Sequence, residues 1–108
     1  LQDARVDVPE NLEMSLLGQY VRTRQNQCAA RNQEFDTASF MLLYATLAAQ
    51  RATKILGIFA RLDRRDGKPQ YLRHMPRLWN YLQRSLAHPA LGPLKDWYTA
   101  NVPAPDGL

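Results

Sequence analysis

Apolar residues recur at intervals of three to four positions between residues 7 and 24, and this spacing predicts an amphipathic helix. Its apolar face consists of Leu12, Leu16, Leu17 and Tyr20. Asp7 is suited to cap the start of this helix, and Pro9 is suited to its first turn. Acidic residues in the first turn suit the positive end of the helix dipole. The polar stretch 25–35 lacks periodicity and predicts a connection.

A second, longer helix is predicted between Asp36 and Gly67, because Asp36 is suited to cap its start and Gly67 to end it. Prolines divide the rest of the chain. Pro69 opens a short turn, Pro76 begins a third helix that reaches residue 87, and Pro93 begins a last helix that reaches residue 101. No stretch alternates with period two, so the predicted fold class is all-α with four main helices.

The second helix is apolar over most of its circumference, which is typical of a helix at the centre of a core. We expect its large apolar residues to be buried against the first and third helices. These residues are Phe40, Leu43, Tyr44, Leu47, Ile55, Leu56 and Phe59. The substitution Leu56→Ala is expected to cost about 2–5 kcal/mol of stability.

One sector of the second helix, about 100° wide at 100° per residue, is polar. It contains Thr46, Gln50, Thr53, Lys54, Gly57, Arg61 and Arg64, with Arg51 at its margin. Two explanations are open: the sector is a solvent-facing edge, or it lines a cleft. Gly57 favours the cleft, because an exposed glycine within a helix costs about 1 kcal/mol relative to alanine and permits close approach. The candidate substrate-binding residues are Gln50, Arg51, Lys54 and Arg61.

The chain has 108 residues, of which 45% are hydrophobic, and this composition is typical of a folded domain and not of a disordered tail. We expect one helical domain over residues 1–108, with residues 102–108 as its tail. The net charge of +4 suits an anionic partner. Asp63 and Asp66 interrupt the basic residues around them, however, and this argues against nucleic acid as the partner.

Cys28 is the only cysteine, so no intrachain disulfide can form, and a reducing compartment such as the cytoplasm is expected. No apolar run is long enough to cross a bilayer, and no membrane partner is expected.

The residue patterns of several catalytic and cofactor sites are absent from the sequence. The glycines are isolated from one another, so no loop is suited to hold phosphates. His74 and His88 lie fourteen positions apart with no cysteine near either, and Asp3 has no catalytic loop before it. We therefore assign neither catalytic residues nor metal ligands. Tyr71, Trp79, Tyr81, Trp97 and Tyr98 are expected to pack in the core, although aromatic rings can also stack on bases.

The stretch QRATKILGIFARLDRRDGKPQYLRHMPRLWNYLQRSLAHPALGPLKDWY, residues 50–98, resembles the C-terminal part of bacterial kinases of the aminoglycoside phosphotransferase family. Within that family it is most similar to the anomeric kinases that phosphorylate N-acetylmuramate and N-acetylglucosamine in cell-wall recycling. The stretch LQDARVDVP, residues 1–9, is similar to the segment that follows their metal-binding loop. The resemblance covers nearly the whole chain and is strongest from residue 50 to residue 86.

The resemblance implies a protein-kinase-like fold in the complete enzyme, in which this chain is a helical subdomain of the C-terminal lobe. The implied partner is the N-terminal remainder of the kinase, which holds ATP and magnesium and carries a catalytic loop with a His-x-Asp pattern. This chain lacks those motifs, so the isolated chain is expected to be inactive and to hold no cofactor. Its basic residues would face an amino sugar acceptor, and an arginine can bind the carboxylate of N-acetylmuramate through two hydrogen bonds.

Two other functions stay open at this point. One is an autonomous basic helical module that binds nucleic acid, and salt-dependent binding to random duplex DNA would indicate it. The other is a module for protein interaction that uses Trp97 and Tyr98 as its anchor, and loss of partner capture in Trp97→Ala would indicate it.

Overall fold

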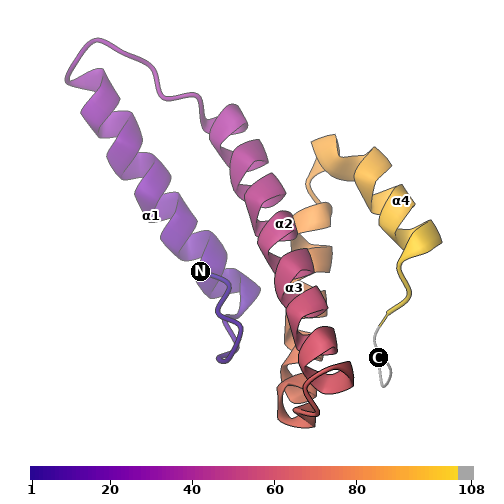
Figure 1. The fold of residues 1–108 in the computed structure, drawn as a ribbon. Helices are drawn as coiled ribbons and strands as arrows, with labels where there is room; N and C mark the ends of the chain where they lie inside the picture. Colours follow the sequence, from indigo (N-terminus) through magenta and orange to yellow (C-terminus); the bar gives the residue numbers. More distant parts are fainter. Residues whose placement is uncertain (105–108) are drawn as a thin grey trace.

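The computed structural model describes residues 1–104, and within this range the chain is helical and contains no strand (Figure 1). Its elements are α1 (Glu10–Ala29), α2 (Thr37–Arg64), the 3-10 helix η1 (Pro69–His74), α3 (Met75–Leu86), the 3-10 helix η2 (Pro89–Leu91) and α4 (Gly92–Asn101). The prediction of an all-α fold with four main helices is confirmed. Residues 102–104 follow the last helix, and the rest of the predicted tail, residues 105–108, lies outside the described residues.

The first helix differs from the prediction at both ends. It begins at Glu10, one residue after Pro9, so Asp7 is not its cap, and no side chain caps this end. It continues to Ala29 and includes much of the predicted connection, so Cys28 is helical. Arginine and glutamine are good helix formers, and a solvated helix end does not need an apolar face. The absence of periodicity was therefore misleading at this end.

The ends of α2 agree with the prediction because both are determined by local chemistry. One carboxylate oxygen of Asp36 accepts the backbone N–H of Ser39 at 3.0 Å, and the Ser39 hydroxyl donates to the other oxygen at 2.7 Å. Gly67 follows the helix with φ of 64°, a left-handed conformation that glycine adopts without a steric penalty. The Lys68 N–H then donates to the Leu62 carbonyl at 2.8 Å, which closes the turn.

The core lies where α2 packs against α3, and small residues of α2 make this contact possible. Ala45, Ala49 and Ala52 are buried on α2, together with Phe59. Ala49, Ala52 and Phe59 pack against the buried apolar residues of α3, which are Leu78, Tyr81, Leu82 and Leu86. Alanine allows two helices to approach closely, so the large side chains of α3 fill the space between the helices.

The predicted core of α2 is therefore only partly correct. Phe59 is buried, and Phe40, Tyr44, Ile55 and Leu56 are half-buried. Leu43 and Leu47 are 57% and 52% exposed, so the prediction that they are buried is wrong. The reason is that α3 packs on the alanine face, while the two leucines lie on another face that no described element covers.

The last helix packs against the core through a tyrosine. Tyr98 contacts the cluster formed by α2 and α3, and its hydroxyl lies 2.8 Å from the hydroxyl of Thr53. Trp97, the neighbouring residue, is exposed and touches the Tyr98 ring edge to face. Of the predicted packing residues in α4, Tyr98 contributes most and Trp97 stays at the surface.

The molecule is elongated, because α1 and the linker after it extend away from the α2–α3 pair (Figure 1). It measures 55 × 28 × 22 Å, with a radius of gyration of 16.4 Å. A compact domain of this length has a radius of gyration of about 13 Å. Between α1 and α2, aromatic side chains make part of the contact, as in the stacked rings of Tyr20 and Phe40, 5.2 Å apart.

Candidate functional site

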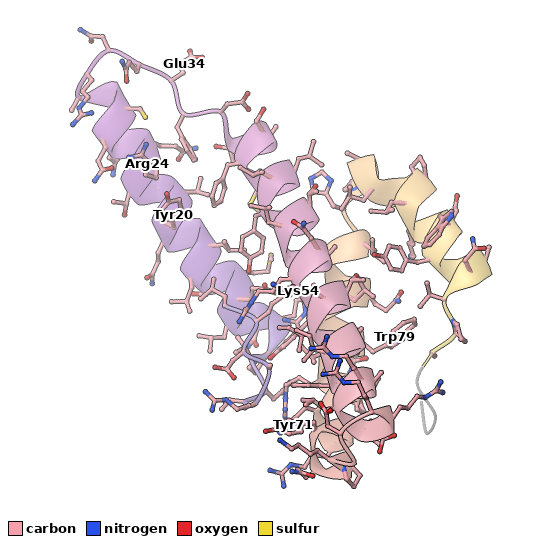
Figure 2. All side chains as sticks on the ribbon, in the orientation of Figure 1. Tyr20, Arg24, Glu34, Lys54, Tyr71 and Trp79 are labelled. Carbon is pink, nitrogen blue, oxygen red and sulfur yellow. The ribbon has the colours of Figure 1, made fainter. Side chains whose placement is uncertain are left out.

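The predicted polar sector of α2 lies on one exposed side of that helix. Gln50, Lys54 and Arg61 are all exposed, and Lys54 lies near the middle of α2 (Figure 2). Ion pairs within residues 1–104 join Arg65 to Asp66 and Arg84 to Glu13, and neither Lys54 nor Arg61 takes part in one. The two cationic groups are therefore available to an anionic group from outside the described chain.

Arg51 lies apart from the other three candidates, as its marginal position in the sector predicts. One of its guanidinium nitrogens donates to the backbone carbonyl of Gln2 at 3.2 Å. This contact ties the N-terminal segment to α2 and places Arg51 at the edge of a pocket. Of the four candidate residues, Arg51 is the one that lines this pocket, while Gln50, Lys54 and Arg61 lie on the adjoining exposed side.

The pocket beside Arg51 has a volume of about 280 Å³ and is mostly apolar. The pocket is lined by Phe40, Leu43, Tyr44, Leu47 and Ile55 of α2, by Leu78 and Tyr81 of α3, and by Leu1 and Gln2 of the N-terminal segment. Such a lining binds apolar groups, with Arg51 as the cationic group beside them.

Gly57 lies on the exposed side of α2, among the candidate residues. A Cβ atom added to Gly57 would meet no atom within 4 Å. No described neighbour therefore needs the space that this glycine leaves. This agrees with either explanation of the polar sector, a solvent edge or a surface that something outside residues 1–104 approaches.

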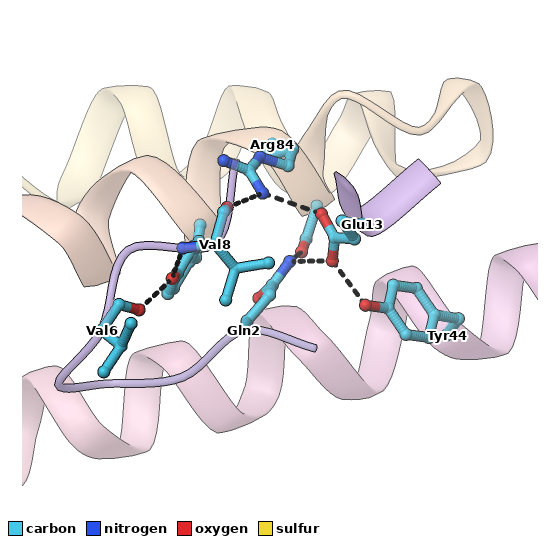
Figure 3. Close-up of polar contacts among 8 residues, drawn as sticks. Gln2, Val6, Val8, Glu13, Tyr44 and Arg84 are labelled. Atoms are coloured by element: carbon cyan, nitrogen blue, oxygen red, sulfur yellow. Dashed lines mark hydrogen bonds and ion pairs between the residues drawn. The ribbon is translucent and has the colours of Figure 1, made fainter. Parts of the chain in front are cut away.

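The N-terminal segment, residues 1–9, lies across α2 and α3 and is held there by hydrogen bonds (Figure 3). The Tyr81 hydroxyl donates to the Val6 carbonyl at 3.0 Å and accepts the Val8 N–H at 2.9 Å. A guanidinium nitrogen of Arg77 donates to the Ala4 carbonyl at 3.3 Å. Side chains of α3 therefore satisfy the backbone of a segment that forms no regular structure of its own.

A buried carboxylate joins this segment to three helices (Figure 3). Glu13, in the first turn of α1, is 1% exposed and accepts from Gln2 Nε2 at 3.0 Å and from Arg84 Nη1 at 2.9 Å. The Tyr44 hydroxyl of α2 also donates to Glu13. Burial and the neighbouring Glu13 carboxylate together raise the pKa of the Tyr44 hydroxyl, so it stays protonated and remains a donor.

The sequence pattern does not predict this network. It places the acidic residues of the first turn at the positive end of α1, but Glu13 is buried. One signal was present in the sequence: Glu13 is four positions before Leu17, so both lie on the same helix face. Its partner Arg84 is 71 residues away, and that pairing depends on the packing of α1 against α3.

Asp3 has a local structural role in this fold. Its carboxylate accepts the backbone N–H groups of Arg5 at 2.7 Å and Val6 at 3.1 Å. These hydrogen bonds, the first of them most, lower the pKa of the Asp3 carboxyl. Asp3 therefore stabilises a turn of the N-terminal segment.

Within residues 1–104, no three His, Cys, Asp or Glu side chains lie close enough together to hold a metal ion. None of the helices in this range combines the length and the apolar character needed to cross a bilayer. The described surface offers an apolar pocket lined in part by Arg51, and on the exposed side of α2 it offers Lys54 and Arg61, which form no ion pair with another described residue.

The chain matches a segment of several enzymes that share one name. No protein-family model matches it. The N-acetylmuramate/N-acetylglucosamine kinase of Caulobacter vibrioides is 43% identical over 103 residues, which are 95% of this chain and 26% of that protein. The kinase of that name from Neisseria meningitidis is 35% identical over 95 residues, which are 87% of this chain and 28% of that protein. The one from Pseudomonas putida is 36% identical over 81 residues, which are 75% of this chain and 23% of that protein.

The predicted resemblance to these sugar kinases is therefore confirmed. The chain spans about a quarter of the length of the curated relatives it matches.

Proposed function

Because most of this chain is homologous to a segment of the N-acetylmuramate/N-acetylglucosamine kinases, we propose that it is the helical acceptor-side subdomain of an ATP-dependent amino sugar phosphotransferase. The observation that carries the proposal is the 43% identity over 95% of the chain to a kinase of which the match covers 26%. A match of this extent to one part of a longer enzyme is what a subdomain produces. We further propose that the enzyme acts in the cytoplasm, in cell-wall recycling.

Phosphoryl transfer requires groups that this proposal assigns to the rest of the kinase. A phosphate cradle, magnesium ligands and a carboxylate that orients the acceptor hydroxyl are the usual requirements of the reaction. ATP and magnesium would bind to the N-terminal remainder. The helical subdomain would supply binding energy and position for the acceptor, and such positioning is itself a large part of catalysis.

We propose that Gln50, Arg51, Lys54 and Arg61 contact the acceptor sugar. They share one side of α2 or its margin, so one ligand of sugar size can meet more than one of them. Lys54 and Arg61 are exposed and form no ion pair with another described residue. A carboxylate or hydroxyl group of the acceptor would satisfy them without the loss of an existing ion pair.

Steady-state kinetics of the full-length enzyme test this assignment. A lost hydrogen bond to a charged group costs about 1.5–3 kcal/mol, so Lys54→Ala or Arg61→Ala should raise the KM for the acceptor by roughly ten- to a hundred-fold. The KM for ATP should change much less. Lys95→Ala and Arg31→Ala are matched controls, because both residues are exposed and neither belongs to α2.

Unchanged KM values for both substrates would contradict the site assignment. If neither substrate's KM changes by more than about twofold, the polar sector is a solvated face, because substitutions on such a face have small effects. That outcome would remove the site assignment and leave the homology intact. A separate assay addresses the role of the subdomain: metal-dependent phosphate transfer to an amino sugar by the 108-residue chain alone would contradict it.

A further inference from the structure

Two leucines of α2 are exposed although the helix provides smaller residues to the core. Leu43 and Leu47 lie one turn apart and are 57% and 52% exposed. Ala45, between them in the sequence, and Ala49, two residues after Leu47, are buried. Burial of large apolar side chains is the main source of stability in proteins, and a contiguous apolar patch left on a protein surface often marks an interaction site. This face of α2 therefore has the character of an interface.

The pocket described above is continuous with these leucines. Leu43 and Leu47 line it, together with Leu78 and Tyr81 of α3. The pocket is thus an extension of the exposed apolar face toward the core, and an inserted apolar side chain would reach α3. Aromatic and aliphatic anchors in pockets of this kind carry much of the energy of protein interfaces.

The position of Leu1 indicates which polypeptide covers this face. Leu1 lines the pocket and is half exposed, and the carbonyl of the next residue, Gln2, accepts a hydrogen bond from Arg51. Any residue that precedes Leu1 in a longer chain must therefore emerge beside Leu43 and Leu47. The curated relatives are about four times as long as the matched segment, which leaves enough polypeptide to cover the face.

The shape of the described chain supports the same conclusion. Its radius of gyration of 16.4 Å is well above the value of about 13 Å for a compact domain of this length. The α1 helix diverges from the α2–α3 pair (Figure 1). Its residues Leu12, Met14 and Tyr20 are also exposed. This shape leaves apolar side chains of both α1 and α2 open to contact with another polypeptide.

We propose that Leu43, Leu47 and the pocket beside them are the docking surface for the polypeptide that precedes Leu1 in the full-length kinase. The segment that docks is apolar at its centre and inserts at least one aliphatic or aromatic side chain into the pocket. The proposal rests on the proposed function, since it takes the full-length protein to be a kinase of the relatives' length. It goes further by assigning the surface through which the helical subdomain joins the rest.

Cysteine labelling of the full-length protein tests this surface. Leu43→Cys and Leu47→Cys are made separately in a Cys28→Ser background, and reaction with a thiol reagent is timed under native conditions and in urea. Leu94→Cys in α4 is the matched control, because Leu94 is an exposed leucine on a different helix. We expect both α2 thiols to react more than about tenfold slower in the native protein than in urea, because docked surfaces react only after local opening. The control thiol should react at similar rates in both conditions.

Equal native and urea rates at Leu43→Cys and Leu47→Cys would overturn the proposal. Protection that disappears on dilution to nanomolar concentration would overturn it too, because a second copy of the chain would then be the cover. The kinase assay is independent of labelling. If the unmodified protein transfers no phosphate to amino sugars but both thiols are protected, the proposed function fails and the docking surface stands.

Discussion

Removing the carboxylate of Glu13 is expected to destabilise the fold more than any other single change at a charged residue of α1. In Glu13→Ala, Gln2 Nε2, Arg84 Nη1 and the Tyr44 hydroxyl all lose an acceptor. Gln2 can still donate to Ser85 at 3.2 Å and Arg84 to the Val8 carbonyl at 3.1 Å, so part of the network survives. The guanidinium charge of Arg84, in contrast, loses its counter-ion.

The expected magnitude follows from the burial of the two partners. Removal of one partner of a buried ion pair costs about 3–5 kcal/mol. The Glu13 side chain is 1% exposed, but the Arg84 side chain is 17% exposed. Water can therefore partly solvate the guanidinium charge that remains in the variant. We therefore expect the lower end of the range, about 3 kcal/mol. Glu13→Gln should cost less, about 1–2 kcal/mol, because its amide oxygen can still accept a hydrogen bond.

Urea unfolding followed by far-ultraviolet circular dichroism measures these differences. Glu10→Ala is the matched control, because Glu10 is exposed in the same turn of α1 and its loss should cost below about 1 kcal/mol. The double variant Glu13→Leu with Arg84→Met should be more stable than Glu13→Ala, since it leaves no unpaired charge. If Glu13→Ala is as stable as Glu10→Ala, the buried network does not hold α1 in place.

Three further predictions concern the core, the exposed side of α2 and the pH response. Leu82→Ala should lower the free energy of unfolding by about 2–5 kcal/mol, because Leu82 is buried between α3 and the alanine face of α2; a loss below about 1 kcal/mol would contradict this packing. Gly57→Ala should raise it by about 0.5–1 kcal/mol in urea unfolding, since the new Cβ meets nothing, and a loss of stability would indicate an unseen contact. Partial burial and the nearby Arg73 and Arg77 lower the pKa of His74 below 6.5. The stability that neutral His74 contributes is therefore complete above pH 6.5, and it is lost as the pH falls from 6.5 toward the pKa of His74 in the folded protein. Arg73→Gln should raise the titration midpoint of His74 in a nuclear magnetic resonance titration, and an unchanged midpoint would contradict the assigned cause.

Local chemistry in the sequence determined where most helices begin and end. Asp36 caps α2 through a hydrogen bond to Ser39, and Gly67 ends the turn after it in a left-handed conformation. Pro76 and Pro93 each lie at the first or second position of a helix, where the missing N–H costs nothing. Each of these effects acts within four residues, so it can be read from the sequence. The side-by-side placement of Gln50, Lys54 and Arg61 follows in the same way from helical periodicity.

Only the tertiary structure decided which apolar face of α2 is buried. Periodicity shows that a face is apolar, but α2 is apolar over most of its circumference, and its leucine and alanine faces both satisfy the pattern. The alanine face packs on α3 because small side chains let the helices approach, and Leu43 and Leu47 stay exposed within residues 1–104. The pairing of Glu13 with Arg84 likewise depends on two helices meeting across 71 residues of chain, which no local pattern specifies. Contacts between distant segments depend on how the helices pack against one another. That packing depends on how well the side chains of all the helix faces fit together.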